Sequence, residues 1–425
     1  MTFDAAGQAK VRDVFVHVRH PDGTADIAGR YRRVQPPAGQ AYGEFEYVGS
    51  WLNNTHGRAF ALDPENLPLR RGPTTTRRRG LLPGVLADAT PDRWGRRIIE
   101  ATRPPGPPML SGDWLLATGD ERVGCLAFST MPSPPPQDPG FAATEDLATI
   151  AEGFERLERG ESPGGLAERL WRAGISLGGA RPKAAVAHEG ALWIAKFARR
   201  DDEYDQCASE HATMRLAEEC GIRAAPTKVL AIGPRKVVLV RRFDRTDEPF
   251  QPTCHYLSGL SALGYDDTTE AGSYAELAAF IHRHGALQVA DRHELFRRMV
   301  FNVLCGNRDD HLKNHGFVRG TDGGWRLSPA FDIVPQPDMP DAQAIGLGIM
   351  GGMATRLNYM SRIKDFDLDA AAADATVAGM IGVMRPWRRM FAEWGVSAAT
   401  IRRLERAFSP QISDGADPDL APIQP

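Results

Sequence analysis

The first third of the chain combines short runs with a strand period and one segment with helix-start signals. Residues 14–18 (VFVHV) form an apolar run, and residues 42–48 (YGEFEYV) alternate with the period of two that is typical of strands. Residues 91–101 (PDRWGRRIIEA) are expected to form a helix, with Thr90 as its N-cap and a proline in its first turn. This part of the chain therefore predicts a mixed domain with short strands.

A proline-rich stretch, MPSPPPQDPG (131–140), is the boundary that the sequence favours, because proline runs form stiff, unpaired segments. After it, residues 145–160 predict a helix, and residues 207–221 predict a second one that ends at Gly221. Two strand pairs are expected in the same region, residues 184–190 with 191–197 around a turn at His188-Glu189-Gly190, and residues 227–233 with 236–243.

From about residue 272 onward the pattern is mainly helical, and the tail after residue 413 is polar, contains proline and is expected to be disordered. The fold class that follows is α+β, with an N-terminal mixed subdomain and a bilobal domain. The bilobal domain has a strand-rich small lobe and a mainly helical large lobe. The expected domains are 1–140, 141–250 and 251–413, with a tail at 414–425.

Composition limits the classes of protein to consider. With 425 residues, 42% of them hydrophobic and 25% charged, the chain is expected to form two or three globular domains. Fifty-one basic residues against 54 acidic ones give a net charge of −3, so there is no global electrostatic attraction to nucleic acid or to a membrane surface.

The cysteines and the ends of the chain indicate a cytoplasmic protein. The five cysteines are widely spread without a C-x-x-C pair, which argues against a disulfide scaffold or a structural zinc site. The N-terminus lacks the apolar core of a signal peptide, and no window is long and apolar enough to predict a transmembrane helix.

The most informative stretch is FNVLCGNRDDHLKNHGF (301–317), which follows an amphipathic helix. Asp309 and Asn314 have the spacing of a kinase catalytic loop, where the aspartate accepts the proton of the acceptor hydroxyl and the asparagine binds magnesium. His311 lies between them and could brace the loop or contact phosphate. Asp332, in the apolar and strand-like run LSPAFDIVP, is a candidate for the second magnesium ligand, because a buried acid needs a partner or a metal.

The region upstream contains the other parts that a kinase needs. Residues 176–183 (SLGGARPK) can form a glycine loop whose backbone donors approach phosphate. Lys196 is a single charge within an apolar strand, and Glu210 on the following helix is its expected partner. The strand at 236–245 would then lead into a hinge that offers backbone groups near Phe243 to adenine.

With these motifs in this order along the sequence, the chain resembles the HipA family of bacterial toxin kinases. The resemblance covers nearly all of residues 12–410 and includes N-terminal segments as well as the kinase motifs. The segments that carry it are GEFEYVGSWL, ATPDRWGRRI, ATGDERVGCLAF, ISLGGARPKA, WIAKF, SEHATMRLA, RRFDR, FNVLCGNRDDHLKNHGF and LSPAFDIVP.

The resemblance implies an ATP- and Mg²⁺-dependent serine/threonine protein kinase that acts as the toxin of a toxin–antitoxin module. It implies a HipB-like helix-turn-helix antitoxin as partner, operator DNA bound only through that antitoxin, and no membrane. It also implies an aminoacyl-tRNA synthetase as substrate, above all the glutamyl enzyme, whose phosphorylation causes growth arrest or persistence.

By position, the resemblance makes Asp309 the catalytic base, Asn314 and Asp332 the magnesium ligands and Ser176 an autophosphorylated serine. Lys196 and Glu210 form the ion pair beside the phosphates. The implied nucleotide-binding residues are Gly178, Gly179, Ala180, Arg181, Pro182, Lys183, Lys196, Arg241, Arg242, Phe243, His311, Leu312, Lys313, Asn314, Phe331 and Asp332.

Three other functions stay open at this point. A small-molecule kinase of the aminoglycoside or choline type shares the spacing of Asp309 and Asn314. A metal-dependent hydrolase would use Asp310 and His311 with His282 or His284, but it has no use for Lys196 and Glu210. A catalytically dead binding module would be expected to have lost one of the four residues Asp309, Asn314, Asp332 and Lys196, which are all present.

Overall fold

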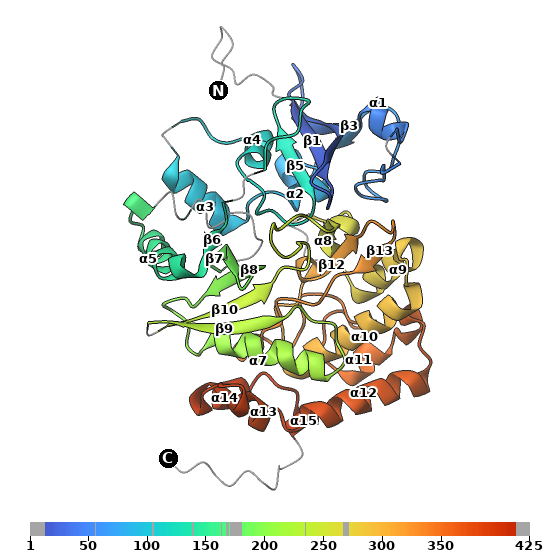
Figure 1. Ribbon diagram of the computed structural model, residues 1–425. Helices are drawn as coiled ribbons and strands as arrows, with labels where there is room; N and C mark the ends of the chain where they lie inside the picture. The colour runs from blue at the N-terminus through green and yellow to red at the C-terminus, as the bar shows by residue number, and fades with distance from the viewer. Residues whose placement is uncertain are drawn as a thin grey trace. The chain divides into compact units, whose positions relative to one another are not determined.

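The structure is a computed structural model (Figure 1), and it contains two compact units that are described separately. The first comprises residues 1–194, 242–269 and 318–322, and the second comprises residues 195–241, 270–317 and 323–425. The residues whose structure is described are 13–55, 57–103, 106–137, 140–162, 164–166, 170, 181–233, 235–266 and 272–413.

The first unit is built on an antiparallel sheet with the strand order β4-β3-β2-β1-β5. Its core is apolar, because alternate residues such as Val14, Val16 and Val18 turn inward and are almost completely buried. The strands predicted at 14–18 and 42–48 are confirmed. The five strands are β1 (Val14–Arg19), β2 (Ala25–Val34), β3 (Tyr42–Tyr47), β4 (Thr74–Thr76) and β5 (Leu126–Ser129).

The helix predicted at 91–101 is present as α3 (Arg93–Thr102), but its N-cap differs from the prediction. Asp92 caps it, because its Oδ1 accepts a hydrogen bond of 2.6 Å from the backbone N–H of Gly95. The hydroxyl of Thr90 donates instead to the carbonyl of Ala87 at 2.7 Å, so Thr90 as N-cap was wrong. The other α-helices of this unit are α1 (Gly49–Leu52), α2 (Gly84–Ala87), α4 (Ser111–Leu116), α5 (Leu147–Glu158) and α8 (Gly259–Ala262).

The proline-rich stretch does not separate the two compact units, since the first unit continues to Ile194. The guanidinium of Arg19, the last residue of β1, donates to the carbonyls of Pro135 and Pro136 at 2.9 and 3.2 Å. Because these carbonyls have a partner within the unit, Pro135 and Pro136 are held by the first unit.

The second sheet has the strand order β6-β7-β8-β10-β9, and its central strand β8 crosses the division between the units at Ile194/Ala195. Glu189 and Gly190 join β7 to β8 with φ values of 49° and 72°, the positive values that a two-residue type I′ hairpin requires. Both predicted strand pairs are therefore confirmed. The strands are β6 (Ala142–Ala143), β7 (Lys183–His188), β8 (Ala191–Phe197), β9 (Thr227–Ile232) and β10 (Arg235–Arg241).

In the second unit, helix α7 (Gln206–Glu219) begins and ends with sequence-encoded caps. The carboxylate of Asp205 accepts a hydrogen bond from the N–H of Ala208 at 2.9 Å. Gly221, with a φ of 74°, allows the chain to turn so that the N–H of Ile222 reaches the carbonyl of Ala217, as in a Schellman motif. The helix predicted at 207–221 and its glycine terminator are confirmed.

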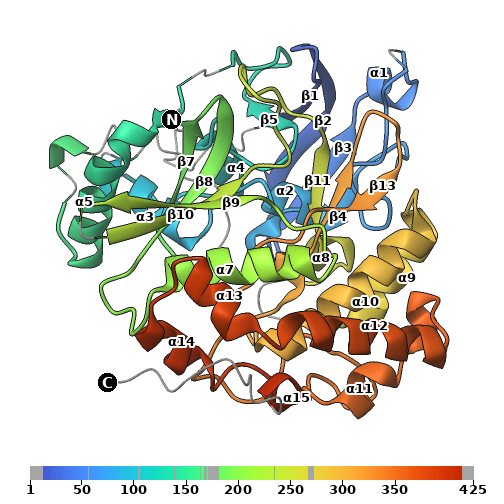
Figure 2. The ribbon, with the colours of Figure 1, turned by 60° about the horizontal axis from the view of Figure 1, so that its bottom comes forward.

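The rest of the second unit is mainly helical, as predicted, and Figure 2 shows α12 running beside α10. Two strands were not predicted, β12 (Gly316–Arg319) and β13 (Trp325–Leu327). They follow β11 (His255–Ser258) in the order of a three-stranded sheet. The helices are α9 (Tyr274–His284), α10 (Gln288–Cys305), α11 (Arg356–Met360), α12 (Ala370–Met384), α13 (Trp387–Glu393), α14 (Ala398–Leu404) and α15 (Pro410–Ser413).

Two further expectations concern the C-terminal tail and membrane-spanning helices. The tail at 414–425 lies outside the described residues. Among the helices of the described part of the chain, none has the length and apolar character needed to span a bilayer.

Candidate active site

The loop that carries Asp309 starts where the buried helix α10 ends. Gly306 is the C-cap of α10 with a left-handed φ of 70°, and its carbonyl accepts a hydrogen bond from the N–H of Gln336 at 2.8 Å. A Cβ atom at this position would lie 2.1 Å from the carbonyl oxygen of Ala407, so only glycine fits here. The packing around Gly306 therefore fixes the point at which α10 ends and the loop begins.

Asp309 presents a carboxylate that accepts no hydrogen bond from the described residues. Its side chain is exposed at the surface of the second unit, and partial loss of hydration raises its pKa above the ordinary value of an aspartate. The carboxylates of Asp332 and Asp310 act in the same direction, while His311 opposes them. A carboxylate with a raised pKa and free lone pairs is suited to accept a proton.

Asn314 lies at the end of a short 3₁₀ turn, Leu312–Asn314, and its side chain folds back on the loop. The amide Nδ2 donates to the backbone carbonyl of Asp309 at 3.2 Å. Among the described residues, none donates a hydrogen bond to the amide Oδ1, which leaves a neutral oxygen of the kind that Mg²⁺ binds. Leu312 is buried, Lys313 is exposed, and buried Nδ1 of His311 has no hydrogen-bond partner in the described structure.

The second unit brings Lys196, Glu210 and Asp332 together. The ammonium of Lys196, on β8, lies 2.5 Å from Oε1 of Glu210 on α7 and 2.7 Å from Oδ1 of Asp332. Burial alone would lower the pKa of Lys196, but the two carboxylates outweigh it and hold this pKa above its ordinary value. The lysine is therefore charged, and it connects the strand, the helix and the Asp332 loop.

The conformation of Asp332 differs from the strand that its apolar neighbours suggest. Pairing of this run is limited to an isolated bridge at Ala330, which exchanges hydrogen bonds with Arg223 and Ala225. Asp332 then adopts a left-handed conformation with a φ of 60°, and its side chain is 36% exposed. The turn at this position directs the carboxylate toward Lys196.

The expected phosphate loop is only partly described. Ser176, Gly178, Gly179 and Ala180 lie outside the described residues. The described end of the loop, Arg181-Pro182-Lys183, leads into β7 in the first unit, where Lys183 is 8% exposed.

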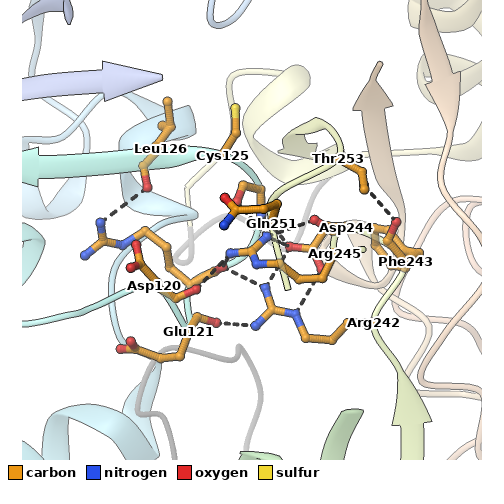
Figure 3. Close-up of polar contacts among 12 residues, drawn as sticks. Asp120, Glu121, Cys125, Leu126, Arg242, Phe243, Asp244, Arg245, Gln251 and Thr253 are labelled. Atoms are coloured by element: carbon orange, nitrogen blue, oxygen red, sulfur yellow. Dashed lines mark hydrogen bonds and ion pairs between the residues drawn. The ribbon is translucent and has the colours of Figure 1, made fainter. Parts of the chain in front are cut away.

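The expected adenine hinge, Arg241–Phe243, has most of its polar groups engaged. The backbone N–H groups of Arg241 and Arg242 donate to the carbonyls of Pro226 and Leu192. The buried guanidinium of Arg242 pairs with Asp244 at 2.7 Å and donates to backbone carbonyls of the 120–125 segment (Figure 3). The Arg242 side chain is therefore a structural element of the first unit, and the hinge prediction rests on backbone groups around Phe243.

The hydrogen bonds that Asp310 makes with His315 and Tyr274 were not predicted from the sequence. Asp310 is 1% exposed, and its two carboxylate oxygens bond to Nε2 of His315, at 3.0 Å, and to the hydroxyl of Tyr274. The spacing of Asp310 and His315 repeats that of Asp309 and Asn314, which is a visible signal in the sequence. Nothing in the sequence points to Tyr274, which lies 36 positions away.

The metal-hydrolase alternative finds no ligand set in the part of the chain that is described. There, no group of three or more histidine, cysteine or acidic side chains is placed to hold a metal ion. Asp310 uses both oxygens within the protein, so it cannot serve as the expected ligand.

A family model described as the HipA-like C-terminal domain matches residues 175–393, more than half of the chain. The chain belongs to the HipA family. The matched range includes the loop at 306–317, Asp332 and the Lys196–Glu210 pair, so the site described above lies within the family's C-terminal domain.

Curated relatives and a solved structure agree with this membership. A putative kinase of Haemophilus influenzae is 27% identical over 35% of this chain and 48% of its own length. The serine/threonine-protein kinase toxin HipA of Shewanella oneidensis is 25% identical over 51% of this chain and 55% of its own length. The chain thus spans about half the length of the curated relatives it matches.

The fold is that of a solved HipA chain. The structure of the Shewanella oneidensis toxin–antitoxin complex of HipA, HipB and operator DNA matches with a TM-score of 0.67 and 16% identity, over 95% of this chain and 96% of that one. The expected mixed α/β fold, with strand-rich and helical parts, is confirmed.

Proposed function

We propose that the chain is an ATP-dependent serine/threonine protein kinase of the HipA type. The observation that carries the proposal is the arrangement in the second unit. One loop presents Asp309 and Asn314, and Lys196 is held between Glu210 and Asp332. This combination of an unengaged carboxylate, hard oxygen ligands and a buried, charged lysine is what phosphoryl transfer from ATP requires.

Each residue has a defined part in the proposed reaction. Asp309 orients the acceptor hydroxyl and takes its proton while the new bond from oxygen to the γ-phosphorus forms and the bond to the β-phosphate oxygen breaks. Lys196, oriented by Glu210, neutralises phosphate charge. Asn314 and Asp332 would hold Mg²⁺, which when bound offsets the charge that develops on the phosphate oxygens.

Replacing Asp309 tests the proposal. We expect Asp309→Ala to abolish phosphoryl transfer to protein while leaving ATP affinity within a few-fold, because the carboxylate acts on the acceptor and not on bound nucleotide. The measurement is transfer of labelled phosphate, with nucleotide affinity determined by calorimetry. Transfer to small acceptors such as aminoglycosides or choline would favour the small-molecule kinase, and undiminished activity of Asp309→Ala would remove the residue from the mechanism.

We further propose that the kinase is the toxin of a toxin–antitoxin pair and that its substrate is an aminoacyl-tRNA synthetase, with the glutamyl enzyme favoured. The support is the family membership and the name of the Shewanella relative. A comparison of phosphopeptides after induction of the wild type and of Asp309→Ala tests it. A synthetase peptide phosphorylated only by the wild type is expected, and its absence while other proteins are phosphorylated would assign another substrate.

Ser176 is proposed as an autophosphorylation site on the basis of the family resemblance. A phosphate there adds roughly −1.5 to −2 charge to the loop that, by the resemblance, binds the phosphates of ATP. We expect phosphate on Ser176 in wild-type protein and none in Asp309→Ala, with weaker ATP binding by the modified fraction. Peptide mass spectrometry after incubation with Mg²⁺ and ATP decides it, and an unmodified Ser176 in active protein would refute the assignment.

A further inference from the structure

Immediately after Asp309 the chain buries a second carboxylate. Asp310 is 1% exposed, and both of its oxygens are engaged within the second unit. Oδ1 lies 3.0 Å from Nε2 of His315, and Oδ2 accepts the hydroxyl hydrogen bond of Tyr274. Burying a carboxylate is costly unless its oxygens accept hydrogen bonds, so the contacts of Asp310 with His315 and Tyr274 stabilise this conformation of the loop.

The contact between Asp310 and His315 joins the two ends of the loop segment next to Asp309 and Asn314, the residues of the proposed reaction. Asp310 directly follows Asp309, and His315 directly follows Asn314. Within the same loop the side-chain amide of Asn314 donates to the carbonyl of Asp309 at 3.2 Å, and the N–H of Asn314 donates to the carbonyl of His311 at 2.9 Å. The loop is thus closed twice, once by Asn314 and once by the buried pair behind it.

Tyr274 connects this pair to the helical core. It is completely buried on α9, and its hydroxyl accepts a hydrogen bond from Nδ2 of Asn302 on α10 at 3.0 Å. The side-chain oxygen of Asn302 in turn accepts from Asn307 at 3.2 Å, at the start of the loop. Burial and the neighbouring Asp310 keep the pKa of Tyr274 well above its ordinary value, so the phenol stays protonated and remains a donor.

We propose that Asp310, His315 and Tyr274 are positioning residues that set the separation of Asp309 and Asn314 for phosphoryl transfer. They touch neither substrate nor metal, and they act by holding the backbone on both sides of the loop. The role in transfer rests on the proposed kinase function, while the role in holding the loop rests on the contacts alone. A positioning error of about 1 Å lowers the rate by as much as roughly a hundredfold, which is why such a network affects the reaction.

The test uses pairs of variants in the full chain. His315→Leu removes the donor to Asp310, whereas His315→Gln can return an amide donor at a similar reach. Tyr274→Phe removes one buried hydroxyl. Tyr31→Phe is its matched control, because Tyr31 is also 0% exposed and its hydroxyl donates a hydrogen bond of 2.9 Å to the carbonyl of Leu81, within the first unit.

Two kinds of measurement separate positioning from general destabilisation. For His315→Leu and Tyr274→Phe we expect kcat to fall about tenfold or more and the Mg²⁺ concentration for half-maximal rate to rise, since both Asp309 and Asn314 are displaced. His315→Gln should recover most of the rate, and Tyr31→Phe should leave both quantities unchanged. Equal effects of Tyr31→Phe and Tyr274→Phe, or an unchanged Mg²⁺ requirement, would overturn the proposal.

Hydrogen exchange of the loop amides provides a readout that does not depend on activity. Faster exchange at residues 309–315 is expected in His315→Leu and Tyr274→Phe and not in His315→Gln or Tyr31→Phe. If the wild type transfers no phosphate but the exchange follows this order, the kinase function fails while the loop-holding role stands. Unchanged exchange in His315→Leu would refute the loop-holding role in either case.

Discussion

At the scale of single residues, Lys196 is a buried cation that pairs with two carboxylates in the second unit. It is 8% exposed and shared by Glu210, which is 4% exposed, and by Asp332. Lys196→Met leaves two carboxylates close together without their cation, and we expect it to lower the free energy of unfolding by about 3–5 kcal/mol, the usual effect of removing one partner of a buried pair. Urea denaturation measures this directly.

The double variant Lys196→Met/Glu210→Gln separates stability from activity. It removes the buried uncompensated charge of Glu210, so part of the lost stability should return, whereas phosphoryl transfer should stay absent because no cation faces the phosphates. Additive losses of stability would show that Lys196 and Glu210 are not energetically coupled. The pairing itself could be expected from the sequence, because a lone lysine in an apolar strand needs an acid, but the participation of Asp332 could not.

At the scale of elements, the junction between α10 and the Asp309 loop depends on one glycine. Gly306→Ala places a Cβ 2.1 Å from the carbonyl of Ala407 and adds a methyl group to a residue with a φ of 70°. The backbone on both sides is packed, so we expect a loss of about 2 kcal/mol or more in the free energy of unfolding. In the exposed part of α12, Gly379 has open space around it, and Gly379→Ala should instead stabilise by about 0.5–1 kcal/mol.

A second prediction at this scale concerns acid stability of the first unit. His255 on β11 is buried, with Nε2 2.8 Å from the carbonyl of Leu62, and burial lowers its pKa to about 4. Because the unfolded chain binds a proton near pH 6.5 and the folded chain does not, the free energy of unfolding falls as the pH drops from about 6.5 to about 4, by about 3 kcal/mol in total.

The control for this prediction keeps the hydrogen bond but removes the titration. In His255→Gln the side-chain amide can still donate to the carbonyl of Leu62. Between pH 6.5 and 4 this variant should therefore lose less free energy of unfolding than the wild type, and the difference is the contribution of His255, about 3 kcal/mol. His17, whose pKa burial lowers to about 4 as well, still contributes in both proteins. Identical pH profiles for the wild type and His255→Gln, measured by urea denaturation, would contradict the assignment.

Elements were predictable from the sequence wherever local signals agree with tertiary packing. The Glu189-Gly190 turn and the Gly221 cap are local, since a positive φ favours glycine and a few polar residues, and both were predicted. The N-cap of α3 moved by two residues because Asp92 competes with Thr90 for the same role. The turn at Asp332 was missed because its lysine partner, which lies 136 positions away, determines it.

At the scale of the whole molecule, fold class and family could be predicted because several ordered motifs agree, while the division into compact units could not. The boundary at Ile194/Ala195 falls inside strand β8, where a continuous apolar run gives no sign of it. The same limit applies to the Asp309 loop. The spacing of Asp309 and Asn314 can be recognised in the sequence, but the contact between Tyr274 and Asp310 depends on how α9 packs.

The last prediction concerns DNA, which a relative's structure contains together with HipA and HipB. With 51 basic and 54 acidic residues, this chain has a net charge of −3 and lacks the positive field that gives non-specific affinity for DNA. Alone, it should bind operator DNA no more tightly than about 10⁻⁶ M at physiological salt, the non-specific range. With the proposed HipB-like antitoxin, affinity should reach about 10⁻⁸ M or better, and this chain should add little to the salt dependence, because the phosphate contacts would belong to that antitoxin. Fluorescence anisotropy with the chain alone, the antitoxin alone and both together, at two salt concentrations, measures these affinities and their salt dependence. Tight, sequence-specific binding by the chain alone would show that a local basic surface, and not the antitoxin, reads the operator.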